Sequence, residues 1–355
     1  MSQKIVNLTP PKLSKKYIKE KITCIRPHRE RIFQVYMQEQ DNKNIFNNYG
    51  HGGAGWTFLF GSVNKSINQF EQCIKENTHL KDDQIVIIGA GCYGMLTAII
   101  LKRKGYNVKI IAADTKNIPS QKAAGFFFPR WRKCSNQEEI EIFKSMGIES
   151  YKTYLQISEN KHPFIKIGPK IMLAYFGLDI NPGFEPYIEQ GLVATPEQVV
   201  INFGNGNMHT VMEYKIIYTN PSIIMSELER NIKELNIQII KEEIESFVDI
   251  KEQIIFNCAG MGAKKLTGDK RIIPVQGHLI TLQNQPDMGQ LQYMLNVKVT
   301  VTNPDGKLRD ELIYYAPREG GILGITFIRG QDSLTANAHE FDRLLDRCKN
   351  FFGLS

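Results

Sequence analysis

Three glycines near residue 90 have the spacing of a site for the pyrophosphate of a dinucleotide. Gly89, Gly91 and Gly94 form the pattern GxGxxG, directly after the apolar run 84–89 and at the start of a helical pattern. Asp114 follows twenty residues after the last of these glycines, at the end of the next strand-like run. A strand, a glycine-rich turn, a helix N-terminus and an acidic residue at this distance together bind a pyrophosphate and a ribose. We therefore predict a parallel, right-handed βαβ unit here.

The fingerprint alone fits both NAD and FAD, so two further segments are used to decide between them. Ser120 can bond to a phosphate or a ribose, and it precedes the small-residue turn Ala123–Gly125. The strand-like run 254–257 ends in Cys258, Ala259 and Gly260. Small residues let the backbone approach a flat ring system closely. A cofactor contacted by so many distant segments is an extended one, which favours FAD. An NAD-binding enzyme of ordinary Rossmann type remains the alternative.

These motifs resemble, in chain order, the FAD-binding motifs of the D-amino-acid oxidase family: IIGAGCYG, AAD…SQKAAGFFFP and IIFNCAGMGA. Two further motifs of that family normally lie near its C-terminus. Here both precede GxGxxG, as Ile25-Arg26-Pro27 and as the loop YGHGGAGWT at 49–57. The chain therefore resembles a circular permutant of that family over residues 22–345. Joining and cutting a domain elsewhere preserves its core when the native termini lie close together.

The resemblance implies an α/β fold, in which a Rossmann-like FAD-binding domain is joined to a substrate domain with a mixed or antiparallel sheet. We expect residues 1–21, which are polar and rich in lysine and proline, to pack poorly. The expected division is 45–134 and 216–270 for a discontinuous FAD-binding domain, and 22–44, 135–215 and 271–345 for the substrate domain.

A flavin oxidase mainly positions the substrate carbon and stabilises charge, because the α-hydrogen leaves as hydride toward flavin N5, driven by the amine lone pair. Arg26 shares strand parity with Ile22 and Cys24, which predicts a guanidinium on an apolar face. Such a group needs a carboxylate, either of a substrate or of an internal salt bridge. By resemblance, Arg26 and the hydroxyl of Tyr314 bind the substrate carboxylate, and the carbonyl of Gly53 receives its amine.

Four other residues near these motifs also bear on the expected site. Tyr315 is expected to face away from Tyr314 across the strand. By resemblance, His51 belongs to the flavin loop and is not a base. A lid tyrosine of the oxidases would fall near Asp310, and His278 stands where the oxidases carry arginine; both are departures from the family pattern.

The residues expected to contact FAD share small size or a position in the glycine-rich loops. The segment that leads from the HGG loop into a helix is expected to stabilise the negative charge of reduced flavin. The full set is Gly52, Gly53, Gly55, Trp56, Thr57, Gly89, Ala90, Gly91, Gly94, Asp114, Ser120, Ala123, Ala124, Gly125, Cys258, Ala259 and Gly260. No metal site is expected.

Composition limits the remaining options. The 355 residues carry a formal charge of +7 from scattered lysines and arginines, which indicates a solvated basic surface and not a nucleic-acid surface. The six cysteines show no CxxC pair, and no signal peptide or membrane-length apolar run is seen, so a cytoplasmic protein is expected.

The sequence thus predicts FAD-dependent oxidation of a small amino acid, either a D-amino acid or glycine-like, with oxygen as acceptor. A dehydrogenase of the same fold with another acceptor and a non-catalytic flavin-binding protein are the alternatives. A homodimer is left open.

Overall fold

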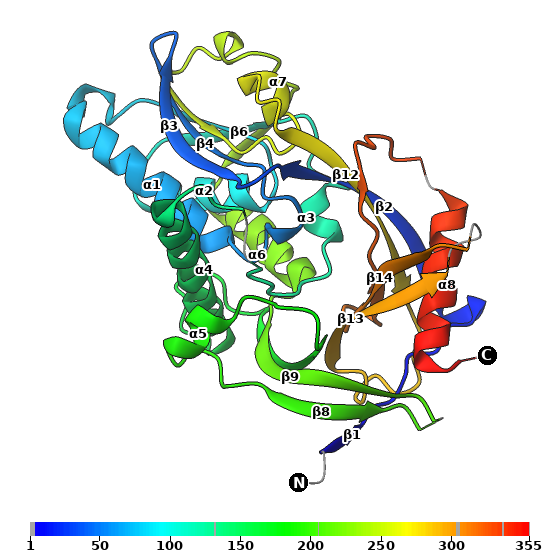
Figure 1. Ribbon diagram of the computed structural model, residues 1–355. Helices are drawn as coiled ribbons and strands as arrows, with labels where there is room; N and C mark the ends of the chain where they lie inside the picture. The colour runs from blue at the N-terminus through cyan, green and yellow to red at the C-terminus, as the bar shows by residue number, and fades with distance from the viewer. Residues whose placement is uncertain (1–3, 131–132, 205, 303–305, 336, 355) are drawn as a thin grey trace.

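A six-stranded sheet contains the predicted dinucleotide-binding unit (Figure 1). The computed structural model describes residues 4–130, 133–204, 206–302, 306–335 and 337–354. The strand order is β10-β6-β5-β11-β4-β3, all parallel except β3, which is antiparallel to β4 at the edge. The strands are β3 (Gln34–Gln40), β4 (Lys43–Tyr49), β5 (Ile85–Ile88), β6 (Val108–Ala112), β10 (Gln238–Lys241) and β11 (Ile254–Asn257).

Alternate side chains of β5 enter two separate cores, as expected of a strand buried on both faces. Ile85 and Ile87 belong to the main core, together with residues of the helices α1 and α2. Val86 and Ile88 belong to a smaller core that includes residues of η4 and α7. The helices are α1 (Leu59–Glu76), α2 (Cys92–Arg103), α3 (Pro119–Lys122), α4 (Gln137–Ser158), α5 (Glu185–Glu189), α6 (Pro221–Glu234), α7 (Ala263–Thr267) and α8 (Ala338–Phe352). Short 3-10 turns are η1 (Lys15–Tyr17), η2 (Gly52–Ala54), η3 (Thr78–Leu80) and η4 (Phe247–Asp249).

A second, ten-stranded sheet is mixed, and α8 packs against it (Figure 1). Its order is β1-β8-β9-β7-β13-β14-β15-β12-β16, and β2 pairs with β12. Two pairs, β1 with β8 and β7 with β13, are parallel and the others are antiparallel. The strands are β1 (Ile5–Asn7), β2 (Ile18–Arg29), β7 (Lys170–Gly177), β8 (Glu197–Asn202), β9 (Met208–Tyr218), β12 (Ile272–Leu282), β13 (Tyr293–Thr302), β14 (Leu308–Ala316), β15 (Ile322–Gly324) and β16 (Ile328–Arg329). The predicted α/β fold with a Rossmann-like unit and a mixed second sheet is confirmed.

The N-terminal segment is better packed than its composition indicates. Ile5–Asn7 forms β1 and pairs in parallel with β8, and the side chain of Leu13 is buried. The expectation of a poorly packed 1–21 is therefore corrected for its described part. The lysine-rich composition led to a wrong expectation of poor packing. The three-residue strand gains its stability from a partner almost 200 residues away, and such a partner leaves no signal in the local sequence. Among the described residues, no helix combines the length and apolar character needed to cross a bilayer.

Candidate active site

The turn between β5 and α2 has the geometry that GxGxxG predicts. Gly89 has φ +102°, a conformation that side chains other than glycine rarely adopt. A Cβ on Gly94 would lie 1.9 Å from the carbonyl oxygen of Gly89, so only glycine lets the helix approach the strand this closely. Gly91 is the N-cap of α2. The first-turn N–H groups of α2 therefore lie just after the carboxyl end of β5, and N–H groups at a helix N-terminus can bind a pyrophosphate.

Distant segments converge on this turn. The N–H of Cys92 donates to Oγ of Ser120 over 3.2 Å, so the Ser120 turn covers the start of α2. Nε1 of Trp56 donates to the carbonyl of Ser120 over 3.2 Å, and the hydroxyl of Tyr93 donates to the carbonyl of Gly55 over 2.6 Å. The loop at 49–57 thus lies directly beside the GxGxxG turn.

The Arg-Pro strand joins the same assembly. His28 and His51 form an antiparallel bridge, which holds the end of β2 against the HGG loop. A Cβ on Gly53 would lie 3.9 Å from Nη1 of Arg26, and a Cβ on Gly260 would lie 3.7 Å from the Pro27 ring. The two glycine-rich loops and the guanidinium, though far apart in the sequence, therefore meet in one place.

Arg26 is buried, with 7% of its surface exposed, and is incompletely bonded. Nη2 donates to the carbonyl of Thr326 over 2.5 Å, and the guanidinium lies against Gly277 of β12. Nε and Nη1 are buried without a hydrogen-bond partner among the described residues. No acidic side chain in that part of the chain pairs with Arg26, and burial lowers the pKa of its guanidinium. An anion that fits beside Arg26 would satisfy both nitrogens.

Two aromatic side chains flank this guanidinium. The ring centroid of Phe327 lies 4.3 Å from Cζ of Arg26, and 57% of Phe327 is exposed. Tyr314 packs on Phe126 with ring centroids 4.4 Å apart and interacts electrostatically with Arg26. Burial raises the pKa of Tyr314, so its hydroxyl stays protonated and can donate a hydrogen bond. Tyr315 is buried on the opposite face and donates to the carbonyl of Leu291 over 3.1 Å, as the strand parity predicts.

The small-residue turn at 123–125 is anchored from the second sheet. Arg318 donates to the carbonyls of Ala123 and Gln121 over 2.8 and 2.7 Å. The carbonyl of Gly125 accepts from the N–H of Thr219 over 2.9 Å, while Ala124 is buried. The segment that begins at Cys258 also lies against the GxGxxG turn. A Cβ placed on Gly89 would be 2.5 Å from the carbonyl oxygen of Cys258, and Ala259 follows Cys258 directly in the chain.

Four residues singled out from the sequence lie in less direct positions. Asp114 is exposed after β6, with one carboxylate oxygen 4.0 Å from Nζ of Lys241. Oγ1 of Thr57 already accepts from the N–H of Phe128 over 3.1 Å. Asp310 is on the surface, paired with Lys298 over 3.1 Å. His278 is buried, with Nδ1 2.8 Å from Oγ1 of Thr326.

Thr326, Phe327 and Arg318 were not predicted from the sequence. The first two lie between β15 and β16, within the stretch GITFIRG at 324–330, whose pattern indicates only a strand. Their closeness to Arg26 arises because β12 pairs with both β2 and β16. A pairing of this kind leaves no signal in local spacing.

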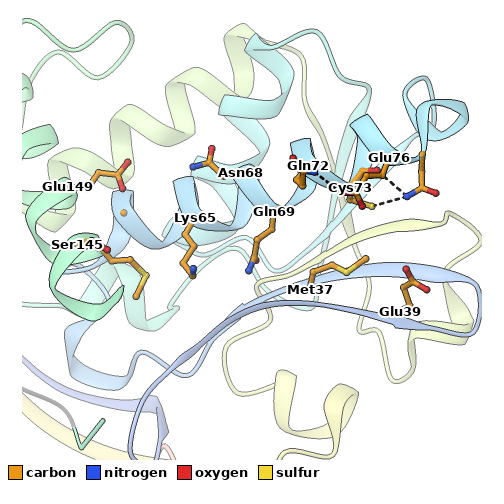
Figure 2. Close-up of a pocket in the computed structure, with 13 residues that line it drawn as sticks. Met37, Glu39, Lys65, Asn68, Gln69, Gln72, Cys73, Glu76, Ser145 and Glu149 are labelled. Carbon is orange, nitrogen blue, oxygen red and sulfur yellow. Dashed lines mark hydrogen bonds between the residues drawn. The ribbon is translucent and has the colours of Figure 1, made fainter. Parts of the chain in front are cut away.

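No group of three or more histidine, cysteine or acidic side chains in the described chain is arranged to hold a metal ion. A groove of about 660 Å³ lies elsewhere, between α1, α4 and β3 (Figure 2). The convergence of motifs, and not the size of a cavity, therefore identifies the candidate active site.

The Rossmann-type βαβ unit and the buried guanidinium of Arg26 thus come together at one place in this fold. A family model described as FAD dependent oxidoreductase (DAO) matches residues 84–354. The chain belongs to this family, and its cofactor is FAD. The matched region begins at the strand before GxGxxG, so the segment that contains Arg26 and the HGG loop precedes it.

Individual relatives are distant. A D-amino-acid oxidase of Dictyostelium discoideum is 25% identical over 211 residues, which cover 57% of this chain and 58% of that protein. A D-amino-acid oxidase of Rubrobacter xylanophilus is 21% identical over 267 residues, covering 74% of this chain and 75% of that protein. The chain thus spans less than two thirds of the length of the Dictyostelium relative. The crystal structure of L-proline dehydrogenase from P. horikoshii superposes with a TM-score of 0.52 at 13% identity, over 77% of this chain and 78% of that one, which shows a shared fold.

Proposed function

We propose that this protein oxidises a small amino acid, either a D-amino acid or one like glycine, at the carbon that bears the amine. The observation that carries the proposal is the state of Arg26: a buried guanidinium, with Nε and Nη1 lacking partners among the described residues, beside Gly53 of the HGG loop. A guanidinium in this state matches a carboxylate in charge and in the geometry of its donors.

In this proposal three residues of the chain bind the substrate. Arg26 binds the substrate carboxylate, and the Tyr314 hydroxyl, kept protonated by burial, adds a second donor. The carbonyl of Gly53 accepts an N–H of the neutral amine, whose lone pair forms the C=N bond as the Cα–H bond breaks with its electrons. FAD, when bound, supplies the acceptor for that hydride. Positioning of the carbon between these groups provides the main rate enhancement.

The cofactor-binding residues are proposed on the same geometry. The first turn of α2, with Gly91 at its N-cap, binds the pyrophosphate, and Asp114 accepts from the ribose of the adenosine. The turn 123–125 and the segment 258–260 border the ring system, and the chain from Gly52 to Thr57 supports negative charge on it through its N–H groups.

The order of the motifs supports a circular permutation of the family fold. The family match begins at residue 84, whereas Arg26 and the HGG loop precede it and still reach the site. On this basis we propose the domain division given above, with 45–134 and 216–270 binding FAD, but with one change. The strand β3 (Gln34–Gln40) is moved from the substrate domain to the FAD-binding domain, because it pairs with β4 in the six-stranded sheet.

The test is an anaerobic titration of the purified flavoprotein with a panel of D-amino acids, glycine and N-methylglycine, followed by the flavin absorbance near 450 nm. We expect at least one of them to bleach the flavin. A flavin that no member of the panel reduces would contradict the proposal and favour a non-catalytic flavoprotein.

A second measurement separates oxidase from dehydrogenase. Readmission of air after reduction should restore the flavin colour and release one peroxide for each imine formed, because oxygen takes both electrons. Slow reoxidation and slow peroxide release in air, together with rapid turnover by an artificial electron acceptor, would assign the dehydrogenase instead.

A further inference from the structure

A break in the pairing of β12 lies within the candidate active site. β12 pairs with β15 from Leu279 onward and with β16 up to Gln276. In the interval between these two ladders, Gly277 and His278 of β12 oppose the three residues 325–327 of the neighbouring segment. An extra residue of this kind forms a bulge, which redirects side chains and is frequent beside active sites.

The two β12 residues in this interval point to opposite faces of the sheet, as successive residues of a strand do. Gly277 lies under Arg26, since a Cβ on it would be 2.8 Å from Nη2 of the guanidinium. The fully buried side chain of His278 lies on the other face, beneath α8 (Figure 1). There its ring meets the ring of Phe341 edge-on, with centroids 4.9 Å apart. The sheet backbone therefore lies between the His278 ring and the guanidinium.

Thr326 connects the two faces. Its carbonyl accepts from Nη2 of Arg26 over 2.5 Å. Its Oγ1 accepts from the main-chain N–H of His278 over 3.0 Å and lies 2.8 Å from Nδ1 of the same residue. Phe327, the next residue in the chain, places its ring over the guanidinium. The position of this one threonine thus sets two contacts of Arg26.

The ring of His278 makes one of two hydrogen bonds to the Thr326 hydroxyl. In a regular antiparallel ladder the N–H of His278 would donate to a main-chain carbonyl, but the bulge removes that partner and the hydroxyl replaces it. Burial, then the charge of Arg26, lowers the pKa of His278, so the ring is neutral at neutral pH. A neutral ring either accepts or donates at Nδ1, and the hydroxyl does the reverse. Nε2 is buried and has no hydrogen-bond partner among the described residues, so the ring acts through Nδ1.

We infer that His278 is a positioning residue for anion binding at Arg26. Its ring fixes the Thr326 hydroxyl, the carbonyl of Thr326 fixes Nη2 of Arg26, and Nε and Nη1 stay available for the substrate carboxylate. A guanidinium oriented in advance binds an anion more tightly, because less side-chain entropy is lost on binding. This inference rests on the carboxylate-binding role given to Arg26 in the proposed function.

Two substitutions of His278 separate positioning from packing. His278→Leu keeps a buried side chain of similar volume against Phe341 but removes Nδ1. His278→Asn loses the ring contact but places an amide near the position of Nδ1. A histidine that only fills space would be replaced better by leucine. A positioning histidine is replaced better by asparagine in anion binding, although asparagine lowers the melting temperature more.

The measurement is the dissociation constant of propionate, a carboxylate without an amine, determined by isothermal titration calorimetry on the purified flavoprotein. His278→Leu should raise this constant about 3- to 10-fold, which is the loss expected for one hydrogen bond. The KM of the substrate found in the panel should rise by the same factor, with kcat changed by less than about twofold. His278→Asn should recover most of the native affinity.

The Thr326 hydroxyl provides an independent test of the route, which also covers a His278 variant that fails to fold. Thr326→Val should weaken propionate binding at least as much as His278→Leu, whereas Thr326→Ser keeps the hydroxyl and should bind more tightly than the valine variant. The double variant His278→Leu/Thr326→Val should bind no more weakly than Thr326→Val alone, because the ring acts only through this hydroxyl. His209→Leu is the matched control: the His209 ring stacks on Phe351 of α8 at 4.1 Å, and its loss should lower the melting temperature without changing either constant.

Native propionate affinity in His278→Leu and in Thr326→Val would overturn the inference, and so would weaker binding by His278→Asn than by His278→Leu. Additive losses in the double variant, or no propionate binding by the native flavoprotein, would overturn it as well. Failure of the proposed function gives a different result. In that case no amino acid of the panel reduces the flavin, while propionate still binds and Arg26→Ala abolishes this binding. The order of the propionate constants then still decides the role of His278.

Discussion

The aromatic ring of Phe327 covers the guanidinium of Arg26 at 4.3 Å from its centroid, although more than half of Phe327 faces solvent. An exposed aromatic residue over a buried cation separates that cation from water and leaves Nε and Nη1 as its free donors. In the function proposed above, this pair lies at the mouth of the substrate site.

Replacement of Phe327 should weaken carboxylate binding modestly. A cation–π contact at a solvent-exposed position contributes about 0.5–1 kcal/mol. Phe327→Leu should therefore raise KM about 2- to 5-fold with little change in kcat, and Phe327→Tyr should retain native values. Steady-state kinetics with the best substrate of the panel measure this. Native KM in the leucine variant would show that the ring contributes nothing to binding.

Removal of the guanidinium should have a much larger effect. Arg26→Ala loses two charge-assisted hydrogen bonds at about 1.5–3 kcal/mol each, so KM for carboxylate substrates should rise about 10²- to 10⁴-fold while FAD stays bound. Arg329→Ala, which alters an exposed pair with Glu30 near the same strand, is the control. Unchanged kinetics in Arg26→Ala would refute its assignment.

A single methyl group should disrupt the cofactor turn. In Gly94→Ala the added Cβ meets the carbonyl oxygen of Gly89 at 1.9 Å, so backbone must move. We expect a loss of about 2–3 kcal/mol or more in stability and a purified protein without flavin colour. Gly289→Ala, whose Cβ meets no atom within 4 Å, should leave melting temperature and flavin content unchanged. A yellow Gly94→Ala variant of native stability would contradict this geometry.

One carboxylate holds α8 against the second sheet. Glu311 is buried and pairs with Arg309 over 2.7 Å, and also with Arg343 and Arg347 of α8. Glu311→Ala leaves the buried guanidinium of Arg347 without its counter-charge and should cost about 3–5 kcal/mol in urea unfolding. Asp342→Ala on the same helix breaks only an exposed pair with Lys21 and should cost less than about 0.5 kcal/mol. Equal losses in the two variants would argue against the network.

His162 should make stability depend on pH. Burial, with Lys166 and Arg103 nearby, lowers the pKa of His162 to about 4, and its Nδ1 accepts from the N–H of Ile165 over 3.1 Å. Between pH 6.5 and 4 the unfolded chain therefore binds a proton that the folded chain excludes. The stability is fully present above about pH 6.5 and falls by about 3 kcal/mol as the pH approaches 4.

Unfolding by urea at a series of pH values measures this dependence. His162→Asn keeps an acceptor for Ile165 and should flatten the curve, whereas His339→Asn in an exposed position of α8 should not. A curve of unchanged slope in His162→Asn would assign the acid sensitivity to other groups.

The βαβ unit was predictable because β5 is uniformly apolar and GxGxxG admits one backbone geometry. The resemblance to a known family predicted that Arg26 and the HGG loop would lie near this unit, which local patterns could not. β1 and Phe327 were not predicted, and the reason is the same for both. The pairing of a three-residue strand and the contact of an exposed ring depend on partners that are distant in the sequence.

The place of β11 has a consequence for biosynthesis. This strand joins the N-terminal hairpin β3–β4 to β5, yet it leaves the ribosome roughly 200 residues after the hairpin. At about 5–20 residues per second the hairpin waits on the order of 10–40 s with its inner edge unpaired. We therefore expect chaperones to bind the nascent chain mainly within its first 50 residues, until β11 has been synthesised and the six-stranded sheet can form.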